Sequence, residues 1–207
     1  MKRNQPLIPG MTYHIYNRAV GNEKLFKEKE NYLYFLKKLQ TYLIPVMNFY
    51  SYTLIPNHFH LMVQIKDEGA LNDLFKLLKK KTFNPTIHNL SDFVMEQVSN
   101  CLNSYAKSFN KKYKRMGGLF MAGTKRNELI TERYLRNLLL YVHKNAVHHG
   151  LTKKIGVWPF DGYNEIVSNS ATWLCASDAI NFFGSREEFI RCHTELTIDI
   201  KRRDWDV

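Results

Sequence analysis

The sequence is poor in cysteine and has no long apolar run. Its three cysteines, Cys101, Cys175 and Cys192, lie far apart and form no Cys-x-x-Cys pair. The sequence therefore supports neither a disulfide framework nor a zinc knuckle. No segment approaches the ~20 apolar residues that a membrane-spanning helix needs, and residues 1–6 lack the apolar core of a signal peptide. We expect a cytoplasmic protein with reduced thiols and no membrane partner.

Acidic residues are the second shortage. Nineteen Asp and Glu stand against 30 Lys and Arg, which gives a formal net charge of +11. Such an excess is typical of proteins that bind polyanions, so nucleic acid is the leading partner. Residues 76–126 hold eleven basic side chains and two acidic ones. This concentration predicts a basic patch rather than an evenly charged surface.

The chain shows no internal repeat or low-complexity tract, and its length suits one substantial core. Residue patterns predict strands at 13–20, 49–55 and 58–65, an extended segment at 119–130, and helices at 28–43, 70–80, 92–113 and 132–149. Pro56 leaves one bent strand open as an alternative to two. Interleaved strands and helices favour an α+β fold, an antiparallel sheet of ferredoxin-like or RRM-like type with helices on one face.

The pattern weakens beyond Leu151, where we expect the chain to cover the core without regular structure. Two short helices are expected after Ser177 and Ser185, and Ser185 with Glu188 fits a capping box. We expect one domain over residues 1–165 and a C-terminal helical extension over 166–207.

His58 and His60 form the most informative pair in the sequence. Residues i and i+2 of a strand point to the same face, so both imidazoles project together while Phe59 turns into the core. Such a pair can form half of a metal site, but a catalytic metal usually has three protein ligands. The alternative is a pair of half-buried strand histidines bonded to the backbone.

The predicted helix at 132–149 offers further polar groups. Tyr141 and Asn145 lie four residues apart and therefore share a face. Among the histidines of this helix, we expect only His148 on that face. The alternative is that Tyr141 is a packed core residue and Asn145 an ordinary residue near the helix end. His14, on the first strand, is expected to be structural.

Four motifs follow one another in an order that is known from a protein family. They are Tyr-His-Ile-Tyr-Asn-Arg at 13–18, Ile-Pro-Asn-His-Phe-His-Leu-Met at 55–62, Gly-Leu-Phe at 118–120 before a basic strand, and the tyrosine segment at 134–147. In this order the chain resembles single-tyrosine HUH transposases, more narrowly REP-associated tyrosine transposases, over residues 8–165. The C-terminal pattern that ends at His193 is similar to that family's tail.

The resemblance implies a role for each matching residue. His58 and His60 take the positions of the metal ligands for Mg²⁺ or Mn²⁺, and Tyr141 takes that of the nucleophile. Asn145 takes the position of the helix amide that helps to bind the metal. Related enzymes usually carry Gln at this position. A second difference is that the Asn-Pro step common in the family is Asn145-Ala146 in this chain.

The implied reaction is nicking and strand transfer on single-stranded or hairpin DNA through a 5′-phosphotyrosine. The covalent intermediate conserves the phosphodiester energy, in keeping with the lack of a Walker motif. The sequence leaves monomer and homodimer open, with Tyr141 serving its own histidines or those of a partner.

Basic residues are expected to follow the DNA backbone. The candidates are Lys79, Lys80, Lys81, Lys111, Lys112, Lys114, Arg115, Lys125 and Arg126. The alternative is an ordinary solvated surface. Two rival functions remain: a non-catalytic module that binds single-stranded nucleic acid, and a metal-dependent hydrolase that uses activated water.

Overall fold

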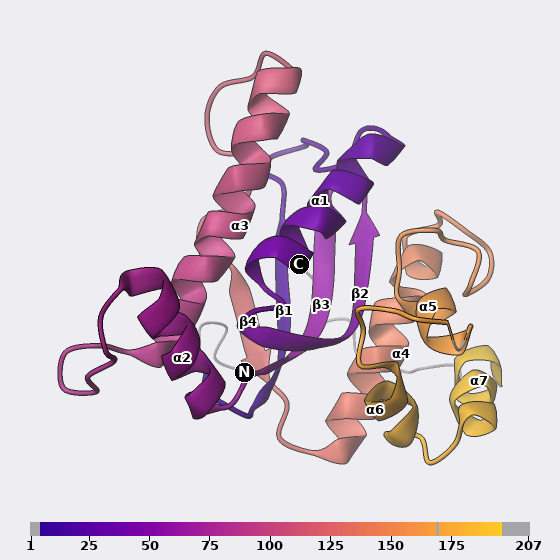
Figure 1. Ribbon diagram of the computed structural model, residues 1–207. Helices are drawn as coiled ribbons and strands as arrows, with labels where there is room; N and C mark the ends of the chain where they lie inside the picture. The colour runs from indigo at the N-terminus through magenta and orange to yellow at the C-terminus, as the bar shows by residue number, and fades with distance from the viewer. Residues whose placement is uncertain (1–4, 169, 196–207) are drawn as a thin grey trace.

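The computed structural model describes residues 5–168 and 170–195 (Figure 1). The elements are β1 (Thr12–Arg18), α1 (Lys29–Tyr42), β2 (Met47–Ile55), β3 (His58–Ile65), α2 (Glu68–Lys79), α3 (Leu90–Lys112), β4 (Lys125–Glu128), α4 (Glu132–His148), α5 (Tyr163–Val167), α6 (Ala176–Asn181) and α7 (Arg186–Glu195). No described helix has the length and apolar character needed to cross a membrane. The three cysteines form no disulfide within the described chain.

The four strands form one antiparallel sheet in the order β2-β3-β1-β4. With α1 and α3 as the connections, this is the ferredoxin-like arrangement, and the predicted α+β class is confirmed. β2 and β3 are two separate strands about a turn at residues 56 and 57, not one bent strand. Within the extended segment at 119–130, only Lys125–Glu128 is a strand, and it pairs with β1.

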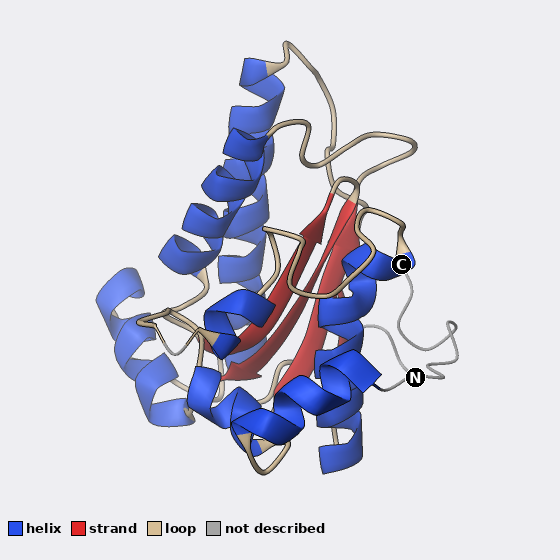
Figure 2. Cartoon of the chain, turned by 90° about the vertical axis from the view of Figure 1, so that its right-hand side faces the viewer, coloured by secondary structure: helices blue, strands red, loops and turns tan. Residues whose placement is uncertain are grey.

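Helices cover both faces of the sheet, as Figures 1 and 2 show. Phe35 of α1 packs against Phe59 of β3 with ring centroids 5.3 Å apart, and Tyr141 of α4 packs against His60 at 5.2 Å. Because neighbouring residues of a strand point to opposite faces, α1 and α4 lie on opposite sides. The prediction of helices on one face is therefore wrong for α4. That helix is buried continuously over residues 138–143, so its pattern does not reveal which face it covers.

The ends of α4 follow from local sequence signals. The Thr131 hydroxyl accepts a hydrogen bond from the Tyr134 backbone N–H at 3.3 Å, and this satisfies one of the open donors of the first turn. Gly150, with φ at +69°, takes the left-handed conformation just past the helix. These two signals set the length of the helix that carries Tyr141 and Asn145.

The C-terminal region packs on the outer edge of β2. The Leu54 N–H donates to Phe160 O and the Gly162 N–H to Tyr52 O, both at 2.9 Å. A Cβ on Gly162 would lie 2.8 Å from Ser51 Oγ, so only glycine permits this close approach. The segment after Leu151 was expected to be irregular, but it contains the short helix α5. The proposed boundary at 165/166 falls within that helix.

Candidate functional site

The sheet face under α4 carries a cluster of histidines. Tyr16 of β1 pairs with His60 of β3, and Arg18 pairs with His58. Paired residues of neighbouring strands share a face, and His14 shares it too because it lies two residues before Tyr16. The ring centroids of His14 and His60 are 5.0 Å apart, as are those of His58 and His60. The predicted pair is therefore part of a larger group.

Hydrogen bonds fix the orientation of both predicted ligands. His60 Nδ1 lies 2.8 Å from His14 Nε2, and His58 Nδ1 lies 2.9 Å from Asn57 Oδ1. An amide oxygen only accepts, so His58 Nδ1 donates and its Nε2 keeps a lone pair. His60 Nε2 is buried and has no hydrogen-bond partner among the described residues. A buried nitrogen without a partner is costly, and this orientation is the one that metal-binding histidines adopt.

The electrostatic environment holds these histidines neutral. Burial lowers the pKa of His14 to about 3. Burial, assisted by neighbouring His149, lowers the pKa of His58 to about 3 as well, and burial lowers the pKa of His60 far below its usual value. The neutral imidazole is the form that binds metal, so no proton need be displaced near neutral pH.

Helix α4 adds Tyr141 and Asn145 to the same place. The Tyr141 ring meets His60 nearly at right angles, with an interplanar angle of 87°. The Asn145 amide approaches His58 and partly opposes the lowering of the His58 pKa. Both polar atoms of that amide are buried and lack a well-formed hydrogen bond within the described chain. The structure thus brings together His58, His60, Tyr141 and Asn145, all from one chain.

Three further residues of the site were not predicted. His14 orients His60, Arg18 lies beside His58, and the His149 ring lies 4.8 Å from that of His58. The expectation that His148 alone would join this face is wrong, although its ring centroid does lie 6.1 Å from that of Tyr141. The spacing from Tyr141 and Asn145 to His149, eight and four residues, was the signal available in the sequence.

The donor set suits a metal bound by two histidines and an amide. No three His, Cys, Asp or Glu side chains in the described residues are arranged to hold a metal ion. The Asn145 amide lies at His58 and could supply a third protein donor. An amide oxygen suits Mg²⁺ and Mn²⁺ alike, whereas imidazole nitrogen favours a transition-metal ion such as Mn²⁺ over Mg²⁺.

Hydroxyls of β2 hold the part of α4 that carries Tyr141. The Thr53 hydroxyl donates to Val142 O, and Ser51 Oγ lies 2.5 Å from His143 Nε2. His143 Nδ1 lies 2.8 Å from His193 Nε2, and His193 Nδ1 lies 2.7 Å from Phe189 O.

The direction of these bonds follows from the last acceptor. A carbonyl only accepts, so His193 Nδ1 donates, His143 Nδ1 donates to His193 Nε2, and the Ser51 hydroxyl donates to His143 Nε2. We call Ser51, Thr53, His143 and His193 the polar clamp. It joins β2, α4 and α7 around the turn that carries Tyr141.

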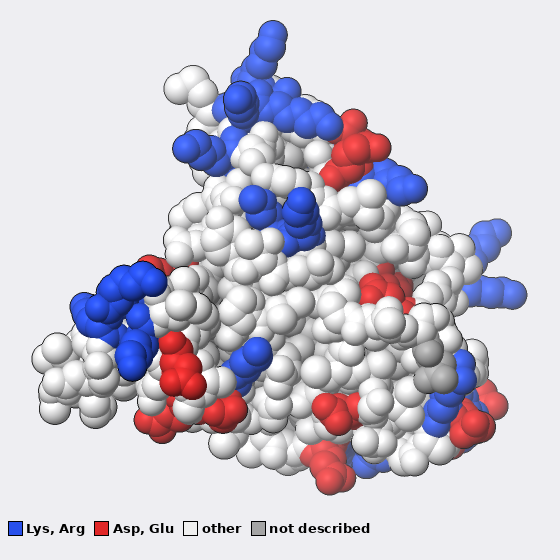
Figure 3. Space-filling model, in the orientation of Figure 1, with Lys and Arg blue, Asp and Glu red and all other residues white. Residues whose placement is uncertain are grey.

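The predicted DNA-binding residues do not form one track. Lys79 is 2.5 Å from Glu96 near the start of α3, whereas Lys112 pairs with Glu28 at its end. Sixteen residues of helix separate Glu96 from Lys112, about 24 Å. Figure 3 shows these as two separate groups of basic side chains, one at the end of α2 and one at the tip of α3.

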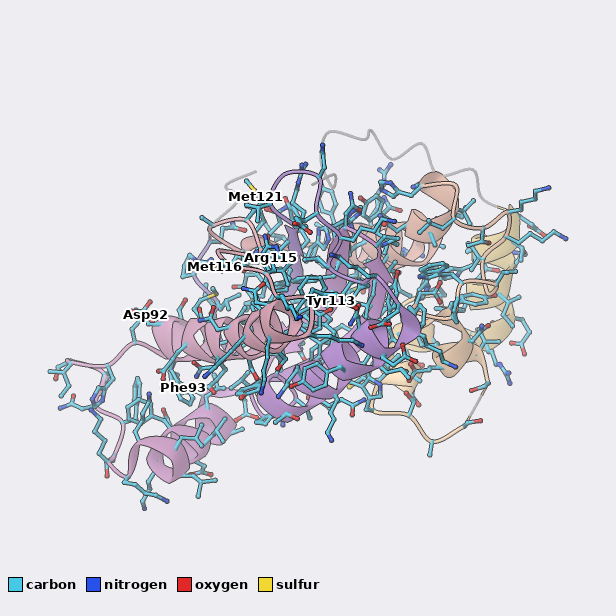
Figure 4. All side chains as sticks on the ribbon, turned by 90° about the horizontal axis from the view of Figure 1, so that it is seen from above. Asp92, Phe93, Tyr113, Arg115, Met116 and Met121 are labelled. Atoms are coloured by element: carbon cyan, nitrogen blue, oxygen red, sulfur yellow. The ribbon has the colours of Figure 1, made fainter. Side chains whose placement is uncertain are left out.

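Some of the basic residues have structural partners. The Arg115 guanidinium donates to Gly118 O at 2.7 Å and to Asn110 Oδ1 at 3.0 Å, which closes the loop after α3 (Figure 4). Arg126 Nε donates to Gln5 O. The exposed members of the set are Lys80, Lys81, Lys111, Lys112 and Lys114. Lys125 pairs with Tyr16 and therefore lies on the histidine face.

Comparison with known proteins supports the fold. No model of a known protein family matches the sequence, and no curated protein matches it. A solved structure, described as a REP-associated tyrosine transposase bound to a REP hairpin, matches with a TM-score of 0.55. The match covers 82% of this chain and 86% of that chain at 13% identity. At this identity, the likeness shows a shared fold and no more.

Proposed function

We propose that the protein is a metal-dependent endonuclease and strand transferase of the HUH type, related to REP-associated tyrosine transposases. Its substrate is single-stranded or hairpin DNA, and Tyr141 is its nucleophile. The observation that carries this proposal is the convergence of buried polar atoms that lack a well-formed hydrogen bond within the described chain, His60 Nε2 beside the Tyr141 ring and the Asn145 amide beside His58. The order of the sequence motifs and the fold shared with a hairpin-bound transposase add support.

The metal site in this proposal consists of His58 Nε2, His60 Nε2 and the Asn145 amide oxygen. A divalent ion held there, Mg²⁺ or Mn²⁺, would offset the negative charge that builds up on the attacked phosphate. His14 is a positioning residue, because its bond to His60 Nδ1 directs Nε2 toward the site.

The reaction proceeds by exchange of one phosphoester for another. The Tyr141 phenol oxygen bonds to phosphorus and loses its proton, while the bond from phosphorus to the 3′-oxygen breaks. The 3′-oxygen takes up a proton and leaves as a hydroxyl, with the 5′-phosphate attached to Tyr141. A 3′-hydroxyl can reverse the step without an external energy source. Tyr141 is 2% exposed, so the side chain or its cover must move before attack.

Two basic residues are placed to meet the strand at this site. Arg18 is exposed at the end of β1 and pairs with His58 of β3. Lys125 of β4 pairs with Tyr16 of β1. In our proposal these residues contact the phosphates next to the cut. The lysines at the ends of α2 and α3 bind more distant parts of a hairpin.

An adduct assay tests the proposal. A fluorescent hairpin oligonucleotide with single-stranded flanks is incubated with protein and Mn²⁺, then run on a denaturing gel. We expect a protein–DNA adduct from the natural chain and none from Tyr141→Phe. The matched control is Tyr134→Phe on the same helix, which is 41% exposed and should retain the adduct.

The two rival functions predict different results in these gels. A hydrolase that uses activated water would cut DNA without forming an adduct, and Tyr141→Phe would still cut. A binding module would shift the DNA in a native gel and produce neither cut nor adduct. Either pattern from the natural chain would overturn the proposal.

A further inference from the structure

A pocket of about 550 Å³ lies outside the histidine cluster, between α4, the segment at 153–155 and the end of α7. The side chains that concern its chemistry are Lys144, His148, Lys153, Lys154, Tyr163 and Glu195. This volume falls within the range of about 300–1,000 Å³ that is usual for small-ligand sites. No role in cutting has been given to any of these residues.

The pocket adjoins the nucleophile along α4. Tyr141, Lys144 and His148 lie at positions i, i+3 and i+7, so they follow one another on one face of the helix. The ring centroids of Tyr141 and His148 are 6.1 Å apart, and His148 lines the pocket. Lys144 is one turn from Tyr141, about 5 Å along the axis. The next phosphate of a DNA strand that is cut at Tyr141 can therefore reach this pocket.

The lining has the chemistry of a nucleotide site. Three lysines and two imidazoles, those of His148 and His193, meet one carboxylate, that of Glu195, so the balance of charge is positive. Val147 and Ile155, with the largely buried ring of Tyr163, supply an apolar wall. Lysines bind phosphate, and an apolar wall can pack against a base of any sequence.

We propose that this pocket, named here the flank pocket, binds the nucleotide next to the cut phosphate of single-stranded DNA. The lysines hold its phosphate, and the apolar wall packs against the base. The proposal rests on the proposed nicking function, because that function places a strand at Tyr141. Its ligand is a deoxynucleoside 5′-phosphate unit, not a free anion.

The first test measures binding without any need for cutting. Thymidine 5′-monophosphate is titrated into the isotope-labelled protein and followed by NMR, with inorganic phosphate and thymidine as separate probes. We expect signals of the flank pocket to shift with the nucleotide, and Lys153→Ala/Lys154→Ala to weaken binding about tenfold through the loss of two charge contacts. Both lysines are exposed, so the variant should fold.

A matched control uses another exposed lysine pair. Lys24→Ala/Lys29→Ala removes the same charge near the start of α1 and should leave nucleotide affinity unchanged. Equal losses in both double variants would overturn the proposal, as would the absence of nucleotide binding. Inorganic phosphate that binds as tightly as the nucleotide would also overturn it, since the pocket would then be an anion site only.

The second test uses DNA in the Tyr141→Phe background, with one oligonucleotide that spans the cut and two truncated at it from either side. We expect Lys153→Ala/Lys154→Ala to lower the salt slope of binding by about 1.4 for the full strand. One truncated strand should be insensitive to the variant. Equal effects on all three strands, or none, would refute a pocket for the flanking nucleotide.

The two proposals fail in different ways. If the nucleotide binds in the flank pocket but no adduct forms with DNA, the nicking function is wrong. If the adduct forms and Lys153→Ala/Lys154→Ala behaves like the natural chain in both tests, the flank pocket is wrong.

Discussion

His193 makes the stability of this protein depend on pH. It lies in the polar clamp, where it donates to Phe189 O and accepts from His143. Burial lowers its pKa from 6.5 to about 4. As pH falls, the unfolded chain takes up a proton at this residue before the folded chain does. The stability that neutral His193 contributes to the folded protein is therefore complete above about pH 7 and is lost as pH falls toward 4.

The size of the effect follows from the two pKa values. A depression from 6.5 to about 4 corresponds to about 3 kcal/mol in full. Between about pH 7.5 and about pH 5, His193 alone should remove about 2 kcal/mol of the free energy of unfolding. This is a large share of the ~5–15 kcal/mol that stabilises a typical domain.

Urea unfolding at the two pH values measures this effect, with His193→Gln as the test variant. Glutamine carries no charge at either pH, so we expect a less stable protein whose pH-dependent loss is about 2 kcal/mol smaller. The control is Thr194→Ala, at an exposed neighbour on α7, which should keep the natural pH dependence. A His193→Gln protein that loses stability as steeply as the natural chain would refute the reasoning.

Three further predictions concern other residues. His14→Ala should weaken Mn²⁺ binding about 10- to 100-fold in calorimetry, because His60 loses its orienting partner; unchanged affinity would exclude that role. Asn145→Asp should bind Mn²⁺ more tightly and Asn145→Ala more weakly, since a carboxylate is the stronger donor; equal affinities would remove Asn145 from the site. Arg115→Ala should lower the free energy of unfolding by about 2 kcal/mol through lost loop contacts; a change in DNA affinity alone would contradict this.

The sequence predicts the elements that carry their own start and stop signals. Helix α4 was expected at 132–149 and is Glu132–His148, because Thr131 caps it and Gly150 ends it. β4 was expected within a longer extended segment but covers four residues, since pairing with β1 decides its length. Sheet pairing depends on distant residues and leaves little trace in the local pattern.

In the candidate site, too, local sequence patterns predict some residues, whereas others depend on contacts with distant parts of the chain. Strand alternation placed His58 and His60 together, and helical spacing placed Tyr141 with Asn145. His14 was assigned a structural role because only the register between β1 and β3 brings it to His60. The roles of Lys112 and Arg115 were similarly hidden, because their acidic partners, Glu28 and Glu23, lie more than 80 residues away in sequence.

Peptide mapping of the protein–DNA adduct is the most direct test of the central claim. The natural chain is incubated with hairpin DNA and Mn²⁺, the adduct is isolated under denaturing conditions and digested, and the modified residue is located by mass spectrometry. We predict a single nucleotide-bearing peptide, with the phosphate on Tyr141. An adduct on another residue, or cut DNA with no modified peptide, would contradict the claim.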